Sequence, residues 1–160
     1  MHRRFSQYPC QCIKSSEQIA CDRKRHDFLP AFISRLLELT KGRVRIFVGN
    51  AGFQMIEGLD RGAVGVMPGC SMFDICIAIY KAWQAGIRAE AFRLHNELLA
   101  MLDHMRQNVE EIIFYEKRIL ARRGAIRHDY CRKPSLAPDA HFDRLFDEQF
   151  EKIKPLLAPL

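Results

Sequence analysis

The chain has 160 residues, of which 48% are hydrophobic and 28% charged, and it carries a net charge of +6. This balance is typical of one globular domain with its own core and excludes a disordered chain. The uncharged apolar stretches fall far short of the roughly 20 residues that span a bilayer. Polar Ser6 and Gln7 stand where a signal peptide needs an apolar run, so we expect a cytoplasmic protein without a membrane segment.

The positive charge lies in short clusters with 19 acidic residues interleaved. No zinc-finger spacing and no aromatic-basic RNA-binding signature accompanies these clusters. A solvated basic surface is therefore favoured, and an anionic small molecule would also fit it. A nucleic-acid-binding domain would rest on charge alone, and we expect no nucleic-acid partner.

The cysteines form no CxxC pair, and without a signal peptide they are expected to be free buried thiols. They are Cys10, Cys12, Cys21, Cys70, Cys76 and Cys131. A zinc site assembled from Cys10, Cys12, Cys21 and His26 would match no common closed spacing. We therefore expect no metal site.

The first predicted elements are a short strand, a loop and a helix. Cys10–Ile13 is a brief apolar patch that ends at Lys14, and Ser15–Asp27 is polar and charged, which predicts a loop. The apolar residues of Phe28–Thr40 recur at helical spacing, and Gly42 is a suitable stop.

The stretch that follows predicts a strand, a helix and a second strand. Val44–Val48 and Ala63–Met67 are continuous apolar runs, and Phe53–Leu59 between them has the spacing of one short helix. Such runs are typical of parallel strands covered on both faces, and the connection suits a single crossover helix. In a parallel unit the working loops follow the carboxyl ends of the strands. Here these loops are residues 49–52 and 68–71.

A helix is predicted to begin at Ser71, whose hydroxyl would cap the first turn with Asp74 in the capping-box position. The preceding turn, Pro68-Gly69-Cys70-Ser71, could hold an anion on its free backbone N–H groups, although a turn followed by a cap is the commoner meaning. Cys70 has only this helix terminus beside it to activate its thiol. Trp83 shares a stripe with Ile79 and Cys76 and should be largely buried.

Three further helices are predicted, at about 88–104, 108–123 and 140–153, with a polar, proline-marked loop before the last. The chain therefore has strands at its front and helices behind them. Three strands with an open edge do not make a stable sheet. The pattern is that of the back part of something larger.

Several sequence blocks resemble one known family. The blocks are IK at 13–14, FVGN at 47–50, GAVGVMPG at 62–69, AGIRAEA at 85–91 and RRGAIRHDYCRKP at 122–134. In this order they resemble the C-terminal half of the dihydrodipicolinate synthase/N-acetylneuraminate lyase family, over nearly the whole chain from about Pro9 to Leu157. The resemblance implies an α/β fold. Residues 1–70 would form the last three strands of a partial (β/α)8 barrel, and residues 71–160 the last barrel helix and a C-terminal helical bundle.

The same resemblance implies a class I aldolase or lyase, which forms a Schiff base with pyruvate or another 2-keto acid and needs no cofactor. Lys14 is similar to the imine-forming lysine at the end of the sixth barrel strand. Gly49 and Met67 would shape the keto-acid pocket through their backbones. Asn50 stands where the family commonly has an acidic residue, and two roles are open for it: a hydrogen bond to a substrate hydroxyl, or a place in the turn.

The first half of the family's barrel has no counterpart in this sequence. That half contains the loop that binds the keto-acid carboxylate and the tyrosine of the fifth strand. Lys14 would then be solvated, and its alternative interpretation is a surface lysine. We expect the chain alone to be inactive. A second hypothesis is a catalytically silent remnant that acts as an interaction or structural module.

The open side of such a sheet should also need a partner. We expect apolar surface on the inner barrel face at Ile46, Val48 and Val66, and an unpaired strand edge beside it. The chain should therefore form a homo-oligomer or dock onto a complementary half-barrel chain.

Overall fold

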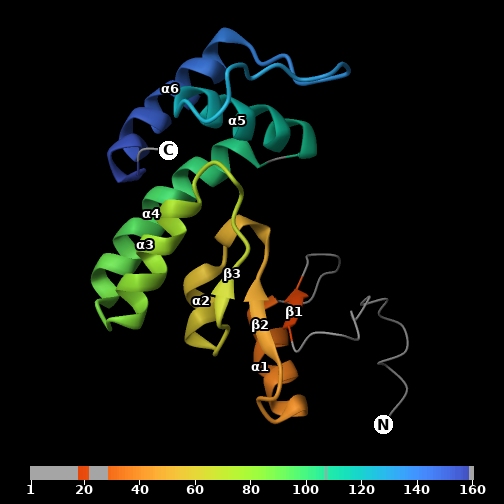
Figure 1. Ribbon diagram of the computed structural model, residues 1–160, viewed down its shortest axis with the longest axis vertical. Helices are drawn as coiled ribbons and strands as arrows, with labels where there is room; N and C mark the ends of the chain where they lie inside the picture. Colours follow the sequence, from red (N-terminus) through yellow and green to blue (C-terminus); the bar gives the residue numbers. More distant parts are fainter. Residues whose placement is uncertain (1–17, 22–28, 107, 159–160) are drawn as a thin grey trace.

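The computed structural model describes residues 18–21, 29–106 and 108–158 (Figure 1). The strands and helices, in chain order, are β1 (Gln18–Cys21), α1 (Leu29–Thr40), β2 (Arg45–Val48), α2 (Met55–Asp60), β3 (Gly65–Val66), α3 (Phe73–Gln84), α4 (Arg88–Met105), α5 (Val109–Arg122) and α6 (Ala140–Ile153). Short 3-10 turns lie at Asn50–Gly52 and Lys154–Leu156. The sheet with α1 and α2 occupies one end of the molecule, and α5 with α6 the other (Figure 1).

The predicted strand–helix–strand unit is confirmed. β2 and β3 are adjacent and parallel, with Phe47 opposite Gly65 and Val48 opposite Val66. The crossover between them is α2. The strands are shorter than the apolar runs, because pairing covers only part of each run.

A third strand lies where a loop was expected. Ser15–Asp27 was predicted to be irregular, but Gln18–Cys21 forms β1 and pairs in parallel with β2, Cys21 opposite Val48. This part of the prediction is wrong because pairing along an existing strand can override the weak local preference of a polar segment. The predicted strand Cys10–Ile13 lies outside the described residues.

The two faces of β2 differ in burial. The face that carries Ile46 and Val48 was predicted to be exposed, and this prediction is wrong. Ile46 and Val48 are fully buried in a cluster with Ile33 of α1 and with Ala63. Side chains alternate between the faces of a strand, so α1 and α2 cover the face that carries both residues. Val66, opposite Val48, is half-buried on that same face.

The opposite face of the sheet is only partly covered by the described residues. Phe47 is half-buried, and its ring lies over Gly65, where an added Cβ would come within 3.0 Å of it. Arg45 and Met67, which share this face by alternation, are exposed. The open surface of the sheet therefore carries Arg45, Phe47 and Met67.

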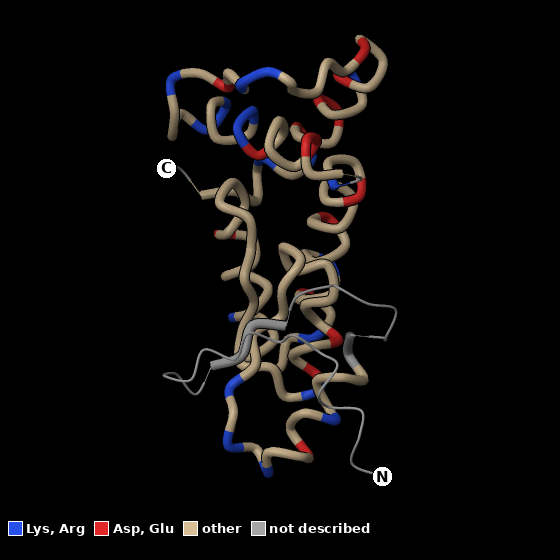
Figure 2. The backbone as a smooth tube through the Cα atoms, turned by 90° about the vertical axis from the view of Figure 1, so that its right-hand side faces the viewer, with Lys and Arg blue, Asp and Glu red and all other residues tan. Residues whose placement is uncertain are grey.

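Helices α3 to α6 begin and end within two residues of the predicted bounds. α3 packs on α4 and α4 packs on α6, and a single core runs through them, with Tyr115 and Phe146 fully buried. Gly86 and Gly124 take positive φ values just after α3 and α5 end, as helix-ending glycines do. Acidic and basic residues are interspersed along the backbone of the helices (Figure 2), which fits a solvated charged surface.

The start of α3 differs from the prediction. The N-cap position is Met72, which has no side-chain hydrogen bond there, and the Ser71 side chain is buried instead. Trp83 is half-buried and packs against the core that contains Ile79 and Cys76. The guanidinium of Arg88 lies 4.1 Å over its ring, and the Phe92 ring packs edge-on at 6.4 Å.

Of the helices in the described ranges, none is both long and apolar enough to cross a membrane.

The cysteines were all expected to be buried, but their burial varies. Cys76 is buried, Cys131 is half-buried and Cys70 is exposed.

Candidate functional site

The carboxyl ends of β2 and β3 bring three of the predicted site residues together. The backbone N–H of Met67 donates to the carbonyl of Val48 at 2.8 Å, which places Met67 beside Gly49. Gly49 is buried, and the Met67 side chain is 41% exposed. Asn50 follows directly in the loop after β2. Lys14, the fourth predicted site residue, lies outside the described part of the chain.

The loop after β2 adopts a backbone that non-glycine residues rarely adopt. Asn50 and Ala51 have φ values of 55° and 54°, a left-handed conformation that costs on the order of 1–3 kcal/mol per residue and clusters at functional sites. His95 of α4 and Arg106, the residue after α4, support it. Arg106 Nη2 donates to Asn50 Oδ1 at 3.3 Å, and His95 Nε2 donates to the carbonyl of Gly52 at 2.9 Å. Neither contact has a signature in the sequence.

His95 makes the stability of this loop depend on pH. Burial lowers the pKa of His95 below its usual 6.5, against the opposing effects of the Gly52 carbonyl and of the Glu57 carboxylate. The unfolded chain therefore takes up this proton first as the pH falls, so the stabilisation is complete above about pH 6.5 and is lost below it. We expect chemical denaturation to show a steeper loss of stability from pH 7.5 to 5.5 in the wild type than in His95→Gln. Equal slopes would contradict this assignment.

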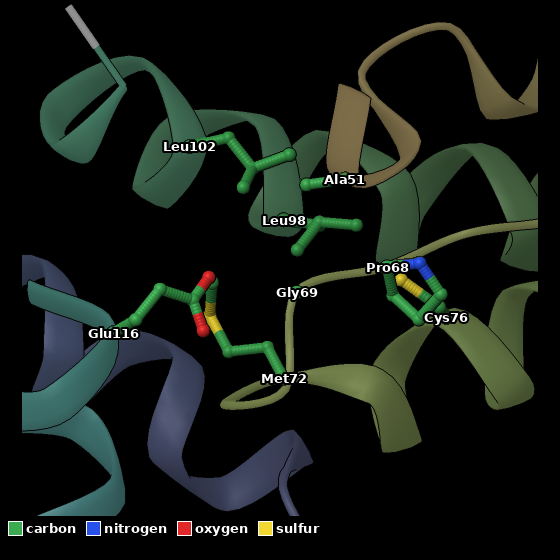
Figure 3. Close-up of a pocket in the computed structure, with 8 residues that line it drawn as sticks. All are labelled: Ala51, Pro68, Gly69, Met72, Cys76, Leu98, Leu102 and Glu116. Atoms are coloured by element: carbon green, nitrogen blue, oxygen red, sulfur yellow. The ribbon is translucent and has the colours of Figure 1, made fainter. Parts of the chain in front are cut away.

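The loop after β3 is held by a carboxylate from the helical part. Glu116 of α5 is buried, and its Oε2 accepts hydrogen bonds from the Ser71 backbone N–H at 3.0 Å and from the Cys70 thiol at 3.5 Å. Figure 3 shows the Glu116 side chain reaching toward the loop at Gly69. Both residues line a cavity of about 10 Å³. The N–H of Ser71, which was expected to be free for an external anion, is thus engaged by the protein's own carboxylate.

A buried ion pair fixes the start of α3 next to this loop. The Arg123 guanidinium binds both carboxylate oxygens of Asp74, at 3.0 and 2.8 Å, and also donates to the carbonyls of Ser71 and Ala158. The two charged side chains are only 5% and 11% exposed. Asp74 is therefore an ion-pair partner rather than the predicted member of a capping box.

Sequence periodicity contained a signal for Glu116 that the prediction did not use. Position 116 follows Ile112 by four residues and precedes Ile119 by three, which places it on the apolar face of α5. A charged residue on such a face needs a buried partner. The partner itself, forty-five residues away at Ser71, has no signature in the sequence.

In the described part of the chain, no group of three or more His, Cys, Asp or Glu side chains could hold a metal ion. What the fold defines is an α/β chain with parallel strands, whose loops at the strand carboxyl ends are fixed by a helical extension. This is the edge of a parallel sheet at which α/β enzymes place their sites.

Among solved structures, the chain is similar to the dihydrodipicolinate synthase of Rhodopseudomonas palustris, with a TM-score of 0.70 and 25% sequence identity. The match covers 80% of this chain and 44% of that one, so the chain spans less than half of the synthase. No protein-family model and no curated protein matches the sequence. The likeness supports the fold and the aldolase-family resemblance.

Proposed function

We propose that the chain is the back part of a (β/α)8-barrel lyase of the dihydrodipicolinate synthase type, in which a lysine forms a Schiff base with pyruvate or another 2-keto acid. The observation that carries the proposal is the structural likeness to that synthase, together with the parallel strands β2 and β3 and the crossover helix α2 between them. The last barrel strands would come from residues 1–70 and the helical extension from 71–160.

The chemistry assigns a role to each predicted site residue. The amine of Lys14 would attack the C2 carbonyl of the keto acid and release water as the imine forms. The backbones of Gly49 and Met67 would line the pocket at the carboxyl edge of the sheet. Asn50, held by Arg106 at 3.3 Å, would meet the substrate from the strained loop.

The reaction needs a partner that covers the sheet. A lysine is nucleophilic only while it is neutral, which requires exclusion of water or a nearby positive charge. The open face with Arg45, Phe47 and Met67 provides no such enclosure among the described residues. We infer that a complementary half barrel or a second copy of the chain supplies it, and that the chain alone is inactive.

Borohydride trapping tests the proposal. The chain is co-expressed with the part of the Rhodopseudomonas palustris synthase that it does not span, and the purified complex is treated with pyruvate and borohydride. We expect the intact mass of this chain to rise by one reduced pyruvate adduct. Lys14→Met should abolish the gain, whereas Lys41→Met, at an exposed lysine after α1, should leave it unchanged.

The second hypothesis, a catalytically silent interaction or structural module, has support in the same structure. The Ser71 N–H, which could have bound an anionic ligand, is taken by Glu116, and the open sheet face is suited to a partner. A stable complex with the half barrel that shows no adduct at any pyruvate concentration would favour this module over the lyase.

A further inference from the structure

Glu116 is a buried carboxylate whose contacts reach out of the helical extension to the loop after β3. It is 8% exposed, and its Oε2 accepts hydrogen bonds from the Ser71 N–H and the Cys70 thiol. Its Oε1 has no hydrogen-bond partner among the described residues. A buried carboxylate oxygen left in this state is costly, so the site calls for a further donor.

Glu116 also lines a small cavity with room for about one water molecule. A cavity of about 10 Å³ lies between Glu116, the loop and the apolar side chains Leu98 and Leu102 of α4 (Figure 3). This volume is about the least that accommodates a single water. A Cβ added to Gly69 would lie 2.1 Å from Oε1, so only glycine lets the loop backbone come this close to the carboxylate.

The Pro68–Ser71 loop, which Glu116 holds, lies next to the proposed keto-acid pocket at Gly49 and Met67. Residues 68–71 follow Met67 directly, and the Met67 N–H is bonded to the Val48 carbonyl at the end of β2. We propose that Glu116 is a positioning residue: its carboxylate, with one water in the adjoining cavity, fastens the Pro68–Ser71 loop to α5 and thereby sets Met67 at the rim of the pocket. The role of the pocket rests on the function proposed above, whereas the fastening of the loop does not.

Cys70 reports on this contact without any need for catalysis. Cys70 is an exposed residue, but partial burial of its thiol raises the thiol pKa, and the Glu116 charge and hydrogen bond raise it further. Cys76, by contrast, is buried, and burial with the nearby Asp74 and Glu116 carboxylates raises its pKa to about 12. Removing the charge at position 116 should therefore free the Cys70 thiolate and leave Cys76 shielded by its burial.

The test is alkylation by iodoacetamide at pH 8 on the full chain, with the rate at each cysteine read by peptide mass spectrometry. In Glu116→Gln we expect the Cys70 rate to rise severalfold relative to Cys131, since each unit of lowered thiol pKa gives about tenfold more thiolate. Glu148→Gln removes the same charge from an exposed position of α6 and should leave the ratio unchanged. An unchanged ratio in Glu116→Gln, or an equal rise in both variants, would overturn the proposal.

A second variant keeps the test valid should Glu116→Gln fail to fold. Gly69→Ala places a methyl group where Oε1 lies, so it should push the carboxylate away and raise the Cys70 rate as well. No rise in a folded Gly69→Ala chain would count against the fastening in the same way.

Whether Glu116 also positions Met67 at the pocket is measured separately, in the assembled complex. There, the pyruvate concentration for half-maximal trapping should rise severalfold in Glu116→Gln, with the maximal adduct retained because Lys14 is intact. An unchanged concentration would overturn the positioning role. A wild-type complex that traps no pyruvate would instead refute the proposed function, and the Cys70 rates would still decide whether Glu116 fastens the loop.

Discussion

Replacing Asp74 by alanine should lower the free energy of unfolding by about 3–5 kcal/mol, the usual cost of removing one partner of a buried ion pair. The reason is that Arg123, 5% exposed, would keep its charge with no carboxylate beside it. The same change removes the acceptor for the Ala158 N–H and so loosens the chain after α6. Urea denaturation followed by circular dichroism measures the effect, which amounts to a large part of the stability of an ordinary domain.

An exposed pair of the same chemistry is the matched control. Asp60 pairs with Arg88 at 3.0 Å, and the two side chains are 56% and 57% exposed. Asp60→Ala should therefore cost less than about 1 kcal/mol. The double replacement of Asp74 by leucine and Arg123 by methionine should be less damaging than Asp74→Ala, because no buried charge is left unpaired. Equal losses of unfolding free energy for Asp74→Ala and Asp60→Ala would show that burial does not determine how much an ion pair stabilises this chain.

Replacing Gly58 by alanine should destabilise the chain by about 1–3 kcal/mol, the usual range for an overpacked core. On helix propensity alone this change, inside α2, would be favourable by up to about 1 kcal/mol. Packing reverses the sign, because an added Cβ would lie 2.2 Å from Cγ2 of Val48 in β2. Equilibrium denaturation of the two chains measures the difference.

The clash can be relieved from the other side. Val48→Ala removes the methyl group that Gly58→Ala would strike, so adding the second change in that background should be close to neutral. The two changes should therefore be strongly non-additive, as residues in contact are. A Gly58→Ala chain as stable as the wild type would mean that α2 does not pack this closely on β2.

The sequence was informative where local pattern and tertiary packing agree. The apolar runs around residues 44–48 and 63–67, with one helical segment between them, lead to the parallel unit that the structure contains. The helices behind it follow from periodicity and from glycines such as Gly86 and Gly124. β1 was missed because Gln18–Cys21 has little strand preference of its own and is defined by its pairing with β2.

The face of the sheet was misjudged for a related reason. A continuous apolar run does not say which alternate residues meet a helix, and α1 and α2 cover Ile46 and Val48 rather than leave them open. At the site, the backbone positions Gly49 and Met67 could be placed from strand ends alone. Glu116 could not, because its contact joins two segments forty-five residues apart and neither one specifies the other.

The position of the reduced adduct tests the proposed chemistry most directly. Pyruvate-treated, borohydride-reduced complex is digested, and the modified lysine is identified by tandem mass spectrometry. We expect modification of Lys14 and of no other lysine of this chain. Modification of Lys24, three residues after the end of β1, would instead make β1 the strand that presents the nucleophile. That result, an adduct on Lys41 or Lys117, or the absence of any adduct in an assembled complex would contradict the assignment of Lys14.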